Sequence, residues 1–122
     1  MTEGTPLARR RCIPCEGGVP PLSDDRARAL LEQLGPGWEL RRTRGHDELV
    51  KTFRFADFME AVGFVNDVTP VAEGEGHHPD LLVAWGRVEV RLWTHVAGGL
   101  TDNDFIVAAK IDELRMVDSD HV

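Results

Sequence analysis

Three of the five histidines in this chain occupy positions from which their side chains can meet. His77 and His78 are adjacent, in the stretch EGEGHHPDLL, and precede a segment with strand-like alternation. His95 follows the next alternating segment, and a short hairpin between the two segments returns its strand end to the histidine pair. Imidazole titrates near neutral pH, so neighbouring imidazoles can give one proton and take up another in a single turnover. The arrangement is typical of the chemistry of a dehydratase or an isomerase.

Carboxylates flank the three histidines in the sequence. Asp104 lies nine residues after His95, and Glu73 and Glu75 precede the histidine pair. We expect Asp104 to reach one rim of the shared pocket and the two glutamates to approach from the other side. A structural interpretation also stands, because Asp104 suits the first turn of a helix, Glu73 suits a solvated helix surface, and a histidine at a strand end is commonly structural.

The other candidates for chemistry are weaker. His46 falls in a predicted turn and His121 in the tail, so we expect both to be solvated. Cys12 and Cys15 form a single C-x-x-C without further zinc ligands or a preceding strand, and we interpret them as free thiols, with weak zinc binding or a redox role as alternatives. The sequence has no G-x-S-x-G, P-loop or dinucleotide fingerprint.

Hydrophobic periodicity predicts the elements that position these residues. In order they are a helix over 24–34 capped by Ser23, a hairpin over 38–55 with its turn at 45–47, a helix capped by Asp57, a hairpin over 81–93 and a helix capped by Thr101. Pro70 predicts a kink or an early stop of the second helix near Thr69, because proline lacks a backbone donor.

The order helix, hairpin, helix, hairpin, helix predicts an α+β fold. Every link between consecutive strands is too short for a parallel crossover, so we expect a four-stranded antiparallel sheet with three helices on one face, a two-layer sandwich. Trp93 and the stem of Arg91 then lie on the open face of the sheet, which makes a homo-dimer or homo-tetramer plausible.

Length and composition are those of one globular domain. The chain has 122 residues, 42% hydrophobic and 29% charged. We divide it into an extended arm over 1–22 that adds no core, a single domain over 23–117 and a polar tail over 118–122. A net charge of −7 argues against a nucleic-acid partner. The chain lacks a membrane-length apolar run and a signal-peptide pattern, so we expect a cytoplasmic protein.

A longer motif resembles the signature of the pterin-4a-carbinolamine dehydratases. Its members, separated by three, five, nine and eight residues, are Glu73, the run His77, His78 and Pro79, then Trp85, His95 and Asp104. The stretches FRFADFMEAVGFV, GWEL and CEGGVPPL are also similar to members of this family, so the resemblance covers most of the chain.

The resemblance implies both a fold and an activity. Family members have a four-stranded antiparallel sheet and three helices, and they convert 4a-hydroxytetrahydropterin to quinonoid dihydropterin in the recycling of tetrahydrobiopterin, without a metal or bound cofactor. By this resemblance His77 and His95 transfer protons and His78 chiefly holds the substrate. Asp104 is expected to orient His95 or to bind the substrate, and Glu73 to tune His77. Pro79 and Trp85 are implied as further substrate contacts.

Two departures from the family pattern accompany the resemblance. Leu81 stands where members often have an aromatic residue, and Asn103 where they often have a basic one, so we expect changes in affinity or pH dependence before loss of activity. Two other interpretations stay open. One is a metal site of two histidines and one carboxylate. The other is a non-catalytic dimerisation or assembly module on the same fold.

Overall fold

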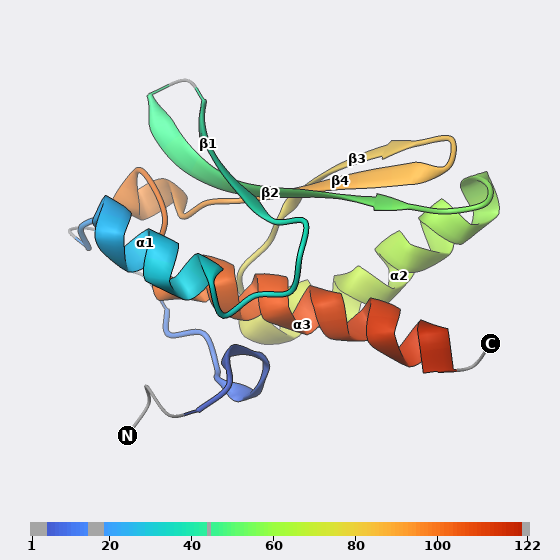
Figure 1. The fold of residues 1–122 in the computed structure, drawn as a ribbon, viewed down its shortest axis with the longest axis horizontal. Coiled ribbons are helices and arrows are strands. Elements are labelled where there is room, and N and C mark those ends of the chain that lie inside the picture. The colour runs from blue at the N-terminus through green and yellow to red at the C-terminus, as the bar shows by residue number, and fades with distance from the viewer. Residues whose placement is uncertain (1–4, 15–18, 44, 121–122) are drawn as a thin grey trace.

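The computed structural model describes residues 5–14, 19–43 and 45–120, with the backbone alone from 116 onward (Figure 1). Within these residues the helices and strands follow the predicted order. They are α1 (Asp24–Leu31), β1 (Glu39–Thr43), β2 (His46–Arg54), α2 (Phe58–Glu75), β3 (Asp80–Ala84), β4 (Arg87–Leu92) and α3 (Asp102–Asp120). Two 3-10 turns complete the set, η2 (Leu7–Arg9) and η3 (His95–Ala97).

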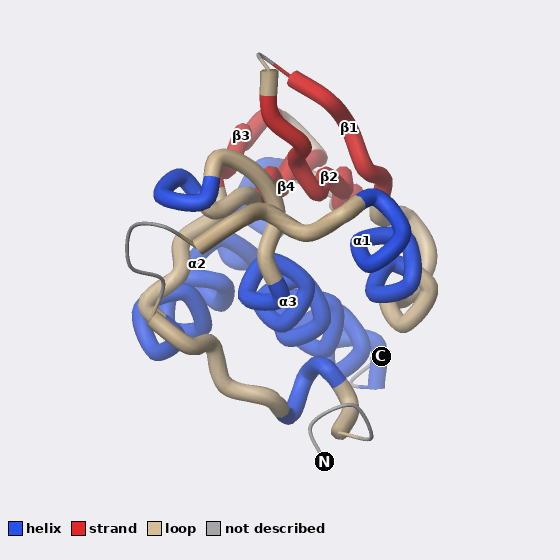
Figure 2. Tube along the Cα trace, turned by 90° about the vertical axis from the view of Figure 1, so that its left-hand side faces the viewer, coloured by secondary structure: helices blue, strands red, loops and turns tan. Residues whose placement is uncertain are grey.

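The four strands form one antiparallel sheet in the order β1-β2-β4-β3. Figure 2 shows the sheet as one layer and the three helices together on one side of it. Among the side chains that face the helices, each at most 5% exposed, are Leu49, Phe53, Val88, Val90 and Leu92. The predicted two-layer α+β fold is confirmed.

Short polar residues begin the first two helices as predicted. The Ser23 hydroxyl accepts the Arg26 N–H at 3.2 Å, and the Asp57 carboxylate accepts the Glu60 N–H at 2.9 Å. Each bond satisfies a backbone donor that the helix leaves without a partner.

The predicted early stop at Thr69 is wrong, because α2 continues through Pro70 to Glu75. The turn before the proline is supported by the Thr69 hydroxyl, which donates to the Val65 carbonyl at 2.9 Å. The consequence is that both Glu73 and Glu75 remain on the last turn of the helix, just before the histidine pair.

The N-terminal arm contributes to the core, which corrects our expectation. Leu7 is 4% exposed and belongs to the main hydrophobic cluster, and Lys110 of α3 donates to the Ala8 carbonyl at 2.9 Å. In Figure 2 the start of the arm, with η2, lies on the side of α3 that faces away from the sheet. The division at residues 22 and 117 remains a prediction.

A search of the described residues for a helix of membrane-spanning length and apolarity found none.

Candidate active site

The three predicted histidines line one cavity of about 370 Å³. It opens where the end of α2, the start of β3 and the end of β4 meet. His77, His78 and Pro79 form one part of its wall, and His95 in η3 forms another. The short β3–β4 hairpin brings these segments together, as the sequence predicted.

The end of α2 sets the position of His77. Gly76 adopts a left-handed conformation with φ of 64° and donates to the Glu73 carbonyl, and the His77 N–H reaches back to the Ala72 carbonyl at 3.2 Å. These two bonds are the Schellman pattern that closes helices after a left-handed glycine. The backbone of His77 is therefore held by the helix that precedes it.

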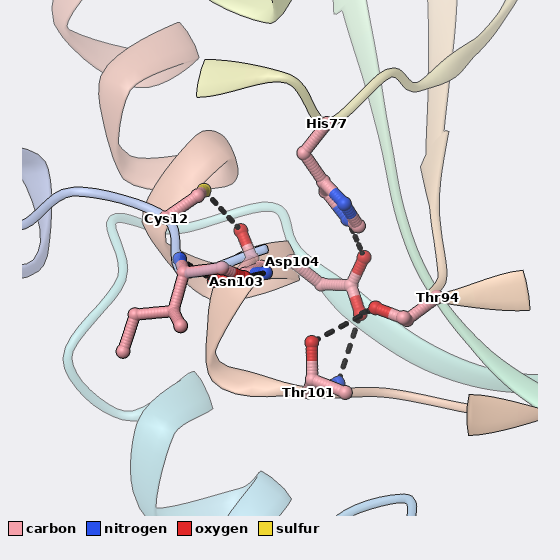
Figure 3. A network of polar contacts seen from close by, with 7 residues as sticks. Cys12, His77, Thr94, Thr101, Asn103 and Asp104 are labelled. Carbon is pink, nitrogen blue, oxygen red and sulfur yellow. Dashed lines mark hydrogen bonds and ion pairs between the residues drawn. The ribbon is translucent and has the colours of Figure 1, made fainter. Parts of the chain in front are cut away.

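A buried carboxylate holds the His77 ring. Asp104 is 0% exposed, and its Oδ1 lies 2.6 Å from His77 Nε2. Its Oδ2 accepts the Thr94 hydroxyl and the Thr101 backbone N–H, each at 2.9 Å. Figure 3 shows Asp104 between His77 and the two threonines. Since Thr94 uses its proton on Asp104, the Thr101 hydroxyl donates to Thr94 at 2.8 Å.

This network determines which nitrogen of His77 can act. With a carboxylate at Nε2, that nitrogen carries a proton, and Nδ1 is the nitrogen left to exchange a proton with a ligand. Asp104 also accepts from the backbone of Thr101, the residue before α3, as the acidic member of a capping box does. The first turn of α3 thus serves both its own cap and the orientation of His77.

Two expected pairings are wrong. Asp104 contacts His77 rather than His95, because the first turn of α3 passes beneath the α2–β3 junction. Glu73 pairs with His78 rather than with His77: His78 Nε2 and Glu73 Oε2 are 2.5 Å apart, with side chains 57% and 69% exposed. An exposed ion pair of this kind contributes little to stability.

His95 is oriented by stacking instead of by a carboxylate. Its ring lies 3.9 Å from the Trp93 ring, centroid to centroid, at 21°. On the other face of Trp93 the His46 ring stacks at 3.6 Å and 15°. The indole is therefore enclosed between two imidazoles, one of which lines the cavity.

His46 is not solvated in a turn, as the sequence had led us to expect, because β2 begins at this residue. Its side chain is 14% exposed, and its Nε2 lies 3.2 Å from the Glu48 carboxylate but makes no hydrogen bond of good geometry. Glu48 also lies 3.6 Å from Arg91. These residues line a second cavity of about 510 Å³, which shares His95 and Trp93 with the first.

Trp85 is not brought to the site. It lies in the turn at the far end of β3 from the histidines, is 73% exposed and lines neither histidine cavity. Its expected contact with a substrate in this cavity is therefore not supported by its position. Glu73 reaches the cavity only through its pairing with His78.

The N-terminal arm forms a wall that the sequence did not predict. Ile13 and Pro14 line the first cavity. The Asn103 side chain accepts the Ile13 N–H at 3.0 Å and donates to the Ile13 carbonyl at 2.6 Å. Such a contact between residues ninety positions apart leaves no local pattern, whereas the T-x-x-D capping signal did mark Thr101 and Asp104.

Glu75 holds the arm one residue earlier. Its Oε1 accepts the Cys12 backbone N–H at 2.8 Å, and its Oε2 lies 3.6 Å from Lys110. That hydrogen bond, with Lys110 nearby, lowers the pKa of the Glu75 carboxyl. Burial, reinforced by the charge of Glu75, raises the pKa of the Cys12 thiol to about 12. The thiol is therefore kept protonated beside the site.

Within the described residues, no group of three or more His, Cys, Asp and Glu side chains is placed to hold a metal ion. A larger cavity lies elsewhere: about 570 Å³ between the arm, β2 and α3, with none of the three site histidines in its lining. The convergence of acid-base groups, rather than size, identifies the smaller cavity as the candidate site.

Comparison with known proteins is consistent across sequence and structure. Residues 20–114 match the family described as pterin 4 alpha carbinolamine dehydratase. A protein of Rickettsia bellii, provisionally named pterin-4-alpha-carbinolamine dehydratase, is 47% identical over 115 residues, which cover 94% of this chain and 99% of that protein.

Two solved structures share the fold. One, from Brucella melitensis and described as a transcriptional coactivator/pterin dehydratase, has a TM-score of 0.69 and 32% identity, covering 77% of this chain and 97% of that one. The other is a pterin dehydratase-like protein described as a RuBisCO assembly factor in the alpha-carboxysome, with a TM-score of 0.54 and 64% and 88% coverage. At 20% identity this second likeness concerns the fold alone.

Proposed function

Because this chain belongs to the pterin 4 alpha carbinolamine dehydratase family, we propose that it dehydrates 4a-hydroxytetrahydropterin to quinonoid dihydropterin and water. The reaction would help to regenerate the pterin that aromatic amino-acid hydroxylases leave in the 4a-hydroxylated form. The 47% identity over nearly the full length of both chains supports the assignment.

One observation carries the mechanism: the buried Asp104 holds His77 Nε2 at 2.6 Å beside a cavity that His78 and His95 also line. A carboxylate fixed on one nitrogen of an imidazole orients the ring and stabilises the imidazolium that forms when the other nitrogen takes a proton. His77 therefore has the features of a general base.

The proposed reaction needs two proton transfers, one from the substrate and one to it, so that the substrate gains or loses no net proton. His77 Nδ1 removes the proton from N5 of the pterin ring, and the N5 electron pair forms the C4a=N5 double bond. The C4a–O bond breaks, its electrons leave with the oxygen, and protonated His95 supplies the proton that makes water. Exchange with solvent then returns both histidines to their starting states. His78, with Pro79 beside it, binds the substrate.

The test is the rate of quinonoid dihydropterin formation from freshly generated 4a-hydroxytetrahydropterin in metal-free buffer. We expect the wild type to accelerate it, and His77→Ala and His95→Ala each to lower kcat by roughly 100-fold or more. Circular dichroism would establish that both variants are folded. Full activity in both variants would refute the proposed histidine roles.

The same measurement separates this proposal from a non-catalytic dimerisation or assembly role. The description of the Brucella melitensis protein as both a coactivator and a dehydratase favours testing for the second role. A folded wild type that gives no acceleration would make the binding role the better explanation, and His77→Ala would then leave partner binding intact.

A further inference from the structure

The part of the N-terminal arm that lines the cavity is held in place by side chains of α2 and α3. Asn103 makes both a donated and an accepted hydrogen bond with the backbone of Ile13, as a neighbouring strand would. Glu75 accepts the N–H of the preceding residue, Cys12, at 2.8 Å. Asn103 is 6% exposed, so these bonds form away from bulk water, where an unmet partner is costly.

The held backbone presents an apolar side chain to the cavity. Ile13 lines the cavity together with His77 and His95, yet it is 74% exposed. An apolar side chain on a held backbone, open to solvent beside acid-base groups, is placed to contact a ligand in the cavity.

Asn103 and Asp104 are consecutive residues in the first turn of α3. Asn103 holds Ile13 while Asp104 holds His77, and Figure 3 shows Asn103 on the Cys12 side of that turn and Asp104 on the His77 side. One rigid turn therefore sets the position of the arm wall and of the proposed general base together.

We propose that Ile13 is a substrate-positioning residue that packs on the pterin ring, and that Asn103 acts through Ile13 by holding its backbone. This inference rests on the proposed dehydratase function. It also gives the Asn103 amide a purpose, because that amide binds the chain's own arm.

Binding and catalysis must be measured separately to test the inference. The first readout is the Kd of 7,8-dihydropterin, followed through tryptophan fluorescence, since Trp93 lines the cavity. The second is kcat and KM for dehydration. The variants are Ile13→Ala, Asn103→Ala and the double variant, with Leu82→Ala as control because Leu82 is 53% exposed on β3 and lines neither histidine cavity.

We expect Ile13→Ala to raise Kd and KM together by about 5- to 10-fold, with kcat within about twofold of wild type, because the lost contact is with the unreactive part of the ring. Asn103→Ala should have a similar effect. The double variant should be no worse than the weaker-binding single variant, because Asn103 acts only through Ile13. Leu82→Ala should match wild type.

Each of the other possible results would contradict a specific part of the inference. If Ile13→Ala binds dihydropterin as wild type does, Ile13 is not a contact and the inference fails, even if Asn103→Ala does not fold. If the two single effects multiply in the double variant, Asn103 does not act through Ile13. Dihydropterin binding with the expected losses but without dehydration would refute the proposed function alone. A wild type that neither binds dihydropterin nor accelerates dehydration would refute both.

Discussion

At the scale of single residues, Asp104 joins two tasks that the sequence presents as alternatives. Its position in the first turn of α3 is explained by the cap it forms with the Thr101 N–H. The same carboxylate orients His77 with its other oxygen. Because both oxygens are used and the residue is fully buried, Asp104 has no freedom to serve His95 as well.

Replacement of Asp104 by asparagine tests this double role. We predict that Asp104→Asn lowers kcat by roughly 100-fold, because the neutral amide does not stabilise an imidazolium and its NH2 group would face a donor, either His77 or the two threonines. The free energy of unfolding should fall by roughly 1 to 3 kcal/mol, since a buried hydrogen-bond partner is lost. Asp102→Asn is the matched control, because Asp102 lies two residues earlier in the same helical turn and its side chain is 47% exposed. Equal activity in the two variants would contradict the role of Asp104.

The Cys12 thiol allows a second prediction at this scale. Since its pKa is raised to about 12, roughly one molecule in 10⁴ carries the thiolate at pH 8. In a Cys15→Ser background, iodoacetamide should therefore modify the folded protein far more slowly than the urea-unfolded protein. The rate should rise about tenfold per pH unit between pH 8 and 10. Modification of the folded protein at the rate of a free cysteine would refute the raised pKa.

At the scale of elements, the junction between α2 and β3 decides where the histidines lie. The prediction from Pro70 placed the end of α2 too early. The left-handed end at Gly76 and the packing of α2 on the core outweigh the loss of one backbone donor at Pro70. If α2 had stopped at Thr69, Glu75 would not be on the helix that holds the arm.

Two glycines at this junction make a matched pair. A Cβ at either Gly74 or Gly76 would meet nothing within 4 Å, but only Gly76 has a positive φ. We predict that Gly76→Ala lowers the free energy of unfolding by about 1 to 2 kcal/mol, because alanine is strained in the left-handed region. Gly74→Ala should raise it by about 0.5 to 1 kcal/mol as a helix-interior substitution. Urea unfolding measures both, and equal effects would contradict the Schellman end.

At the scale of the whole molecule, one exposed apolar surface lies apart from the candidate site, at the start of α2. Phe58, Met59 and Val62 at the start of α2 are 51%, 84% and 37% exposed. Neighbouring exposed apolar side chains of this size are typical of interfaces between subunits.

We therefore predict that the purified protein is a homo-dimer or homo-tetramer. Light scattering should give two or four times the chain mass of 13.6 kDa. Met59→Glu should lower the observed mass, because a charge would be buried without a partner. Val19→Glu, at an exposed valine of the N-terminal arm, should leave the mass unchanged. A monomeric wild type at micromolar concentration would refute the prediction.

The sequence by itself determined the order of elements, the face of the sheet that packs on the helices, and the convergence of His77 and His95 on one cavity. These follow from periodicity, capping residues and a short hairpin, all of which act between residues close in the chain. Which carboxylate pairs with which histidine depended on the tertiary structure. Asp104 went to His77 and Glu73 to His78 because helix packing sets which side chains face each other.

Only the tertiary structure revealed the contacts between distant segments. The hydrogen bonds of Asn103 with Ile13 and the stacking of His46 on Trp93 join residues ninety and forty-seven positions apart. Neither leaves a periodic or spacing signal, because the packing of α3 against the arm and the pairing of β2 with β4 create them. The sequence thus predicted which groups gather at the candidate site, and the packing of α3, the arm and the sheet decided how each is held.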